Sequence, residues 1–186
     1  LPGVNDHTFS DYWMYFGRSG GTGHEKYDAL AIDLEGFGIG LSSTMGYPMR
    51  VVGADPEREQ WVRNTTSHNT VVVNDQGQSK TYGGFPMHFE DAGKVKVMDA
   101  ENTGAYNEVD IYRRSVVTVK AENGVEYAVD FFRVLGGSDH VFSFHVHGQD
   151  VNETEGLNLT HQPMGTYAGP DVPLGIWSPN PYAGDT

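Results

Sequence analysis

The chain has 186 residues, enough for one domain of ordinary size that buries a sizeable core without disulfides or metals. It contains no cysteine, which excludes a disulfide framework, a thiolate zinc site and a cysteine nucleophile. Lysine and arginine number 12 against 25 aspartates and glutamates, and the net charge of -13 argues against a nucleic-acid or anionic-membrane surface. Any polyanionic substrate would therefore need a locally basic groove.

The first informative segment in chain order covers residues 18–47 and opens with a glycine-loosened loop, RSGGTGHEKYD, that carries His24. No helix pattern follows the glycines and no Lys-Ser/Thr pair closes them, which excludes a P-loop. A second segment, WVRNTTSHNTVVVNDQGQS at 61–79, places His68 directly before an apolar run. Two strand edges of a small β-sandwich can converge, so we expect His24 and His68 to share one groove suited to acid/base chemistry on a sugar.

Apolar and polar residues alternate with period two in many short runs, which predicts strands. The runs lie at residues 70–74, 94–98, 115–121, 126–135 and 140–148. Turn residues separate them at 74–77, 122–124 and 136–139, and the Asn123-Gly124 pair is the strongest hairpin signal. No long stretch shows the period of an apolar helix face, and residues 55–61 would form one helical turn at most.

This pattern predicts an all-β domain, an antiparallel β-sandwich of two packed sheets. We place that domain at residues 1–160. The segment 161–186 is rich in proline, glycine and tyrosine without periodicity, and is either an irregular tail or an incomplete continuation of the sandwich. No apolar run approaches the roughly 20 residues that a membrane helix needs.

The order of these segments resembles the C-terminal β-sandwich domain of heparinase II/III-like polysaccharide lyases, over roughly residues 13 to 148. The matching motifs are His24-x-x-x-Asp28-x-Leu30, the turn at Gly46, Ser-His-Asn-Thr at 67–70, YRRSVVTVK and FHVHG. The resemblance implies a supersandwich-like domain that follows an N-terminal α/α-toroid, with the active groove between the two. The chain contains no toroid sequence, and it begins with neither a methionine nor a signal-peptide pattern, so we expect a fragment of a longer protein.

The resemblance also implies β-elimination at a uronic acid, in which a base removes the C5 proton and an acid protonates the departing 4-O oxygen. The substrate carboxylate resists the carbanion that forms beside it, so the site must offset its charge. His24 would act as acid/base or neutralise the carboxylate, and the His68-Asn69 pair would support the site. The alternatives are a loop histidine bonded to the backbone and, for Asn69, a strand-end cap. We expect the parent protein to be a periplasmic or secreted polysaccharide lyase. We expect the isolated chain to be inactive.

Two other classes of protein stay open, a non-catalytic carbohydrate-binding or structural β-sandwich and an unrelated all-β domain.

Metal-containing relatives hold zinc with a second histidine two residues after the first, an aspartate near the end of the next strand, and the histidine of the His-Asn pair. In this chain Lys26 stands at the position of the second histidine and Thr44 at that of the aspartate, so His68 is the one ligand that remains. A zinc site needs three or four ligands, so we predict no metal, unless Asp28 or a residue of the absent toroid completes the ligand set, and no other cofactor.

Lys26 is either a solvated loop lysine or a substitute for the ion's charge that holds His68 or a substrate carboxylate. Arg18, Tyr47 and Arg50 flank the same loops and would contact an acidic sugar through a guanidinium or a stacked ring, or else are ordinary surface residues. His145-Val146-His147 has a spacing that suits metal chelation, but no carboxylates are near it in sequence, and we assign it a structural role.

Overall fold

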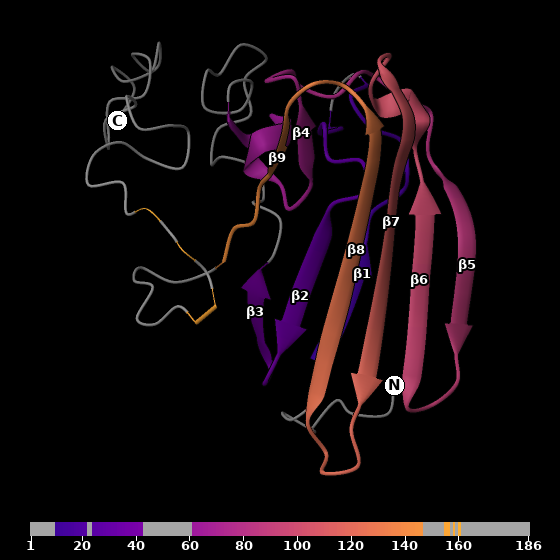
Figure 1. The fold of residues 1–186 in the computed structure, drawn as a ribbon, viewed down its shortest axis with the longest axis vertical. Coiled ribbons are helices and arrows are strands. Elements are labelled where there is room, and N and C mark those ends of the chain that lie inside the picture. The colour runs from indigo at the N-terminus through magenta and orange to yellow at the C-terminus, as the bar shows by residue number, and fades with distance from the viewer. Residues whose placement is uncertain are drawn as a thin grey trace.

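The structure, a computed structural model, describes residues 10–21, 24–42 and 61–146, together with Glu155, Gly156, Asn158 and Thr160. The elements of this part of the chain are strands and two short 3-10 helices, with no α-helix, which confirms the all-β class (Figure 1). The strands are β1 Ser10–Met14, β2 Ile32–Gly36, β3 Ile39–Ser42, β4 Val71–Val73, β5 Phe85–Asp91, β6 Val95–Glu101, β7 Val109–Lys120, β8 Glu126–Gly136 and β9 His140–Phe142. The 3-10 helices are η2 Thr65–Ser67 and η3 Thr103–Ala105.

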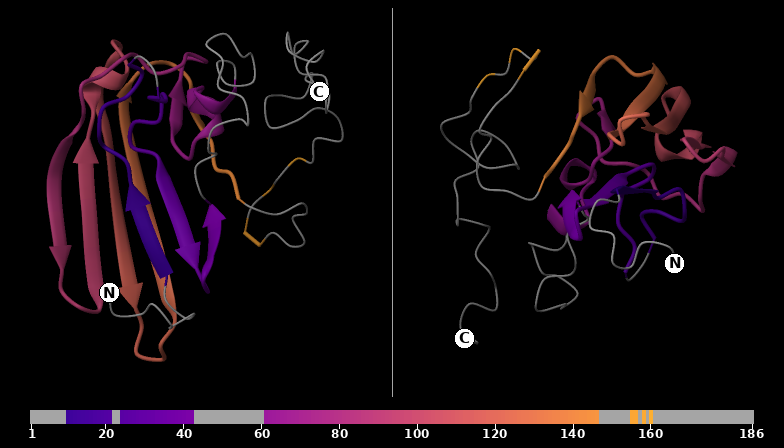
Figure 2. Two further views of the ribbon diagram at one scale, coloured as in Figure 1. Left: turned by 180° about the vertical axis from the view of Figure 1, so that it is seen from behind. Right: turned by 90° about the horizontal axis from the view of Figure 1, so that it is seen from below.

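The strands form three antiparallel sheets with the orders β1-β2-β3, β5-β6-β7-β8 and β4-β9. The β1–β3 sheet lies against one face of the long four-stranded sheet, so the two make a layered β-structure (Figure 2). A buried cluster from both layers and from β4 fills the space between them, including Leu30, Val73 and Tyr112. No helix among the described residues is long and apolar enough to cross a membrane.

The predicted runs 70–74, 94–98, 115–121 and 126–135 overlap β4, β6, β7 and β8, and the predicted Asn123-Gly124 turn joins the last two, with Gly124 at a φ of 83°. No predicted run covers β1, β2, β3 or β5. In β5 every residue is exposed and Pro86 interrupts the run, so the apolar alternation is weak. The stretch 140–148 was predicted as one strand, whereas β9 ends at Phe142; the predicted tail 161–186 lies outside the described residues.

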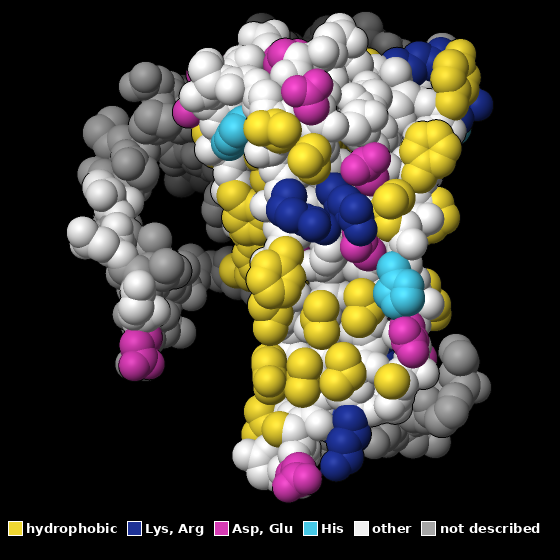
Figure 3. Space-filling view, turned by 45° about the vertical axis from the view of Figure 1, so that its right-hand side comes forward, with side chains coloured by type: hydrophobic (Ala, Val, Ile, Leu, Met, Phe, Trp, Pro, Cys, Tyr) yellow, Lys and Arg dark blue, Asp and Glu magenta, His cyan; other side chains and the backbone are white. Residues whose placement is uncertain are grey.

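The outer face of the four-stranded sheet carries exposed apolar side chains in cross-strand rows (Figure 3). Tyr127, Val129, Phe131 and Leu135 of β8 are exposed there. Arg113 interrupts the rows and donates two hydrogen bonds to Asp99 at 2.8 and 2.7 Å, which is the main reason that the pKa of Asp99 lies below its usual value. None of the described residues covers this face.

The inner face of the same sheet carries Arg114, whose side chain is fully buried. Its guanidinium makes a bidentate pair with Asp130 at 2.9 and 2.6 Å. It also donates to the carbonyl oxygens of Leu30 at 2.7 Å and of Asn69 at 2.5 Å. One side chain therefore ties the four-stranded sheet to both segments that the sequence singled out.

Candidate functional site

The loop that carries His24 and the turn that carries His68 lie side by side, and Arg63 joins them. Its Nε donates to the carbonyl oxygen of Glu25 at 2.9 Å and its Nη2 to that of Gly21 at 2.9 Å. The backbone adds a bond from Tyr27 N to Arg63 O at 3.0 Å. The two histidine motifs are thus held together by hydrogen bonds on both sides of His24. That His24 and His68 share one groove stays a prediction.

Glycine gives the loop its course. Gly20 has a φ of 69°, and a Cβ there would lie 2.3 Å from Cε1 of Tyr27 and 3.1 Å from Cα of Lys80. Ser19 next to it exchanges two backbone bonds with Thr81, at 3.1 and 2.9 Å. The loop is therefore pinned on both sides of the glycine, and a side chain at this position has no room.

We predict that Gly20→Ala lowers the free energy of unfolding by about 2 kcal/mol or more, because it combines left-handed backbone strain with overlap of the Tyr27 ring. Gly124→Ala is the matched control, since Gly124 has a φ of 83° and open space around an added Cβ. The control should lose about 1 kcal/mol. Urea unfolding of both variants measures the difference, and equal losses would show that the contact with Tyr27 is unimportant.

His68 is the buried member of the pair. It follows η2, whose N-cap Asn64 accepts a hydrogen bond from Thr66 N at 3.2 Å. The side chain of His68 is 3 % exposed, and its Nε2 lies 3.2 Å from the Val62 carbonyl oxygen, to which it donates. Burial first, then the positive charge of Lys26, lowers the pKa of His68 to about 3. The ring is therefore neutral near neutral pH, and in this structure it offers almost no surface to a substrate.

Because His68 is buried in its neutral form, it makes the free energy of unfolding depend on pH in the acidic range. Its folded-state pKa lies below the unfolded value of 6.5, so its contribution to stability is complete above pH 6.5 and is lost as the pH falls toward 3. The slope approaches about 1.4 kcal/mol per pH unit. We expect the slope of His68→Gln to lie below that of the wild type by up to this amount in urea unfolding from pH 7 to pH 4, because the raised pKa of Asp28 acts in the opposite sense in both proteins. The exposed-site control His88→Gln should keep the wild-type slope. A wild-type slope in His68→Gln would contradict the burial of a neutral imidazole.

Lys26 lies close enough to His68 and to Asp28 for its charge to act on both. Burial lowers the pKa of Lys26, while the charges of Asp28 and Asp33 raise it. Lys26 is half-buried, and its charge acts on His68, which is the arrangement that the charge-substitution hypothesis requires. That hypothesis stays a prediction.

Asp28 is a functional candidate to which the sequence analysis assigned no catalytic role. It entered there as part of the His24-x-x-x-Asp28-x-Leu30 motif and as a substitute metal ligand. Burial raises its pKa to about 6, and Lys26 opposes that shift. Its Oδ1 is buried and has no hydrogen-bond partner, although its backbone N–H donates to Ser19 Oγ at 3.2 Å. A carboxyl group that titrates near neutral pH beside a half-buried lysine is the kind of group that can exchange protons. The spacing His-x-x-x-Asp was the only signal that could have found it.

Asn69 is buried and ties three segments together. Its side chain accepts from the backbone N–H of His145 at 2.6 Å and donates to Ile32 O at 2.9 Å and to Ser42 Oγ. Ser42 in turn donates to the carbonyl oxygen of His145 at 2.5 Å. These contacts fit the strand-end role that the sequence left open, and the substrate-binding role assigned to Asn69 stays a prediction.

The exposed part of the site surrounds Arg18. Arg18 pairs with Glu25 at 2.5 Å, and its guanidinium lies 5.9 Å from the centroid of the Tyr82 ring. Lys80 lies 5.5 Å from the same centroid, and Tyr82 is 82 % exposed. An exposed ring with two cations, near the exposed His24, suits an acidic sugar. Tyr82 could not be predicted as part of the site, because the residues around it follow no motif or periodic pattern.

Part of the predicted site lies outside the described residues, namely Tyr47, Arg50, Thr44, Gly46 and His147. Within the described ranges no three His, Asp or Glu side chains are grouped to hold a metal ion. The residues present also fit a zinc ion poorly, because Lys26 brings a positive charge to the neighbourhood of His68. The absence of a metal stays a prediction.

Known proteins resemble this chain in sequence and in fold. The family model described as heparinase II/III-like, C-terminal, matches residues 15–178. No curated protein matches the chain. Among solved structures, the chain is similar to a heparinase III, the BT4657 gene product with methylated lysines, at 21 % identity and a TM-score of 0.62, over 80 % of this chain and 22 % of that one.

Two further structures are similar. A crystal structure of heparinase III shows 22 % identity and a TM-score of 0.52 over 66 % of this chain and 18 % of that one. The heparan sulfate lyase HepC from Pedobacter heparinus shows 20 % identity and a TM-score of 0.50 over 63 % and 18 %. The chain thus spans about a fifth of the length of these structures, and the likeness shows a shared fold. Because the family model covers most of its residues, the chain belongs to the heparinase II/III-like family and matches the C-terminal domain of that family.

Proposed function

We propose that the chain forms one wall of the substrate groove in a polysaccharide lyase that cleaves a uronic-acid-containing polysaccharide by β-elimination. The observation that carries the proposal is the pairing of the His24 loop with the His68 turn through Arg63. An N-terminal α/α-toroid of the parent protein would complete the groove and supply a tyrosine base. The relatives described as heparinase III and heparan sulfate lyase support an acidic glycan as the substrate. Such a substrate also favours a periplasmic or secreted parent protein.

In this reaction the C5–H bond breaks and its proton passes to the base. The C4–O4 bond then breaks, its electron pair leaves with O4, and O4 takes a proton from an acid as the C4–C5 double bond forms. Negative charge accumulates on the uronate carboxylate, so cations aimed at that group lower the barrier. Arg18 and Lys26 are the cations closest to His24 in sequence, and His24 donates to the carboxylate or moves a proton.

The buried residues would act behind this surface. The charge of Asp28 raises the pKa of Lys26 and so favours its ammonium form. His68 is neutral and holds the turn through its bond to Val62, which suits a positioning role better than contact with the sugar. Asn69 fixes the neighbouring strands.

The test is an assay of the parent protein on alginate, heparan sulfate and hyaluronan. The proposal expects new ultraviolet absorbance from a 4,5-unsaturated uronate with at least one of them. Binding without absorbance would overturn the lyase proposal in favour of a non-catalytic carbohydrate-binding domain. The isolated chain should be inactive; cleavage by the chain alone would show that it needs no toroid.

A further inference from the structure

A cavity of about 300 Å³ lies apart from the histidine loops. It opens between β1 and the ends of β6 and β7, and its lining includes Tyr12, Met98, Val116 and Thr118. No residue of the candidate site lines it. Its volume is at the lower end of the range of ligand pockets, about 300 to 1,000 Å³, and suits a single sugar ring.

Three lysines gather at this cavity in a chain whose net charge is -13. Lys94, Lys96 and Lys120 all line it, and the backbone N–H of Lys120 donates to Lys94 O at 2.8 Å, which makes those two residues cross-strand neighbours. Like charges so close in a sheet are unfavourable unless something compensates for them. Asp11, Asp91 and Glu126 also line the cavity, so it holds three cationic and three anionic side chains and suits a ligand with a single carboxylate.

Nearby carboxylates compensate the lysines only weakly. Lys96 lies 3.5 Å from Asp91 and Lys120 lies 3.2 Å from Glu126. The lysine side chains in these two pairs are 43 % and 56 % exposed, and exposed ion pairs contribute about 0 to 1 kcal/mol. A ligand carboxylate can therefore compete for the ammonium groups at little cost.

The rest of the lining narrows the ligand class. Asp11, Asp91 and Glu126 line the cavity beside the lysines, so a densely charged anion such as a phosphate would meet three carboxylates. A purely apolar ligand would remove six charged groups from water without replacing their hydrogen bonds. A sugar ring with one carboxylate can form hydrogen bonds with both the lysines and the acidic side chains. Its carboxylate accepts from the lysine ammonium groups, and its hydroxyls donate to the protein carboxylates. The rings of Tyr12 and Phe89, the latter 74 % exposed, offer apolar surface to the C–H face of the sugar.

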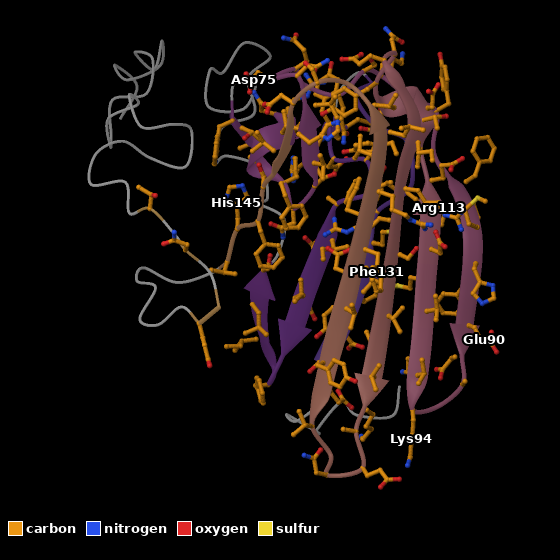
Figure 4. The ribbon with its side chains drawn as sticks, in the orientation of Figure 1. Asp75, Glu90, Lys94, Arg113, Phe131 and His145 are labelled. Atoms are coloured by element: carbon orange, nitrogen blue, oxygen red, sulfur yellow. The ribbon has the colours of Figure 1, made fainter. Side chains whose placement is uncertain are left out.

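We propose that this cavity is an accessory binding site for one uronate unit of an acidic glycan, remote from the histidine loops. Figure 4 shows Lys94 at the foot of the long sheet, far from His145, which contacts the candidate site through Asn69. The site would hold a second stretch of the same polysaccharide while another stretch lies in the groove. The choice of a uronate rests on the proposed function; the cavity and its charges do not.

The experiment uses the full chain and two matched probes, methyl β-D-glucuronide and methyl β-D-glucoside, which differ only in the carboxylate. NMR titration should shift the signals of Met98, Phe89 and Tyr12, with the glucuronide bound about tenfold more tightly than the glucoside, as one or two charge-assisted hydrogen bonds would give. The double variant Lys96→Ser/Lys120→Ser should weaken glucuronide binding about tenfold. Lys80→Ser is the control, because Lys80 lies beside Tyr82 at the other site, and it should leave this binding unchanged.

Equal affinity for the two probes, shifts confined to the His24 loop, or no shifts at all would each overturn the proposal. Lys94→Ser, at the most exposed of the three lysines, provides a second variant should the double variant unfold, and it should weaken binding in the same direction. The readout does not depend on catalysis. If the parent protein lacked lyase activity while these shifts persisted, only the proposed function would fail.

Discussion

His24→Ala in the parent protein is expected to lower kcat/KM on its uronate polysaccharide by about 10²- to 10⁴-fold, the usual contribution of one positioned acid/base group. His24 is exposed on a loop that Arg63 holds through the carbonyl oxygens of Glu25 and Gly21, so removing the imidazole should leave the loop in place. The rate of appearance of the 4,5-unsaturated uronate measures the loss. Thermal unfolding of the variant should match that of the wild type.

The matched control is His88→Ala. His88 is an exposed histidine on β5 whose Nε2 lies 3.1 Å from Glu90, and it belongs to no part of the candidate site. The control should retain wild-type kcat/KM. Full activity in His24→Ala would remove His24 from the mechanism, and equal losses in the two variants would point to a nonspecific effect.

Arg114→Met is expected to lower the free energy of unfolding by about 2 to 4 kcal/mol, chiefly because two backbone carbonyl oxygens lose a fully buried donor, while Asp130 is 27 % exposed and is partly solvated once its partner is gone. The substitution leaves Asp130 without its bidentate partner and removes the donor to the carbonyl oxygens of Leu30 and Asn69. Methionine fills much of the same volume, so loss of packing contributes little. Urea unfolding of the chain measures the change.

Arg113→Met is the matched control, one residue away on the opposite face of β7. Arg113 also makes a bidentate pair, with Asp99, but its side chain is 27 % exposed and bonds no carbonyl of the loops. Its loss should cost about 1 kcal/mol. If both variants lost the same amount, Arg114 would not be the residue that ties the histidine segments to the sheet.

Period-two alternation predicted the second half of β7, at 115–121, where Val116 is buried against the other layer and its neighbours are less buried. It missed the first half of β7, where one of the buried side chains is that of Arg114. The same signal failed for β5, which lies at the edge of its sheet with both faces exposed. Asn123-Gly124 predicted its hairpin because a left-handed backbone is intrinsic to that dipeptide and needs no tertiary contact. Strands and turns could thus be predicted from the sequence where they depend on neighbouring residues and not on contacts with distant parts of the chain.

The candidate site was less predictable, because it depends on contacts between segments that are far apart in the sequence. The His24 and His68 motifs were found through the family resemblance, but the residue that joins them, Arg63, has no sequence signal, since its acceptors are backbone carbonyls. The burial of His68 and the raised pKa of Asp28 follow from packing of segments about 40 residues apart in the sequence. A flanking run of polar residues, as around His68, does not distinguish a groove from a buried polar network.

The central proposal is that the loop at residues 18–28, which Arg63 holds against the His68 turn, faces the scissile uronate. A crystal structure of the parent protein carrying His24→Ala, with an uncleaved uronate oligosaccharide, tests it most directly. The account predicts the uronate carboxylate within hydrogen-bond distance of Arg18 or Lys26, over the loop at residues 18–28. An oligosaccharide bound in the groove with that loop outside contact distance would contradict it.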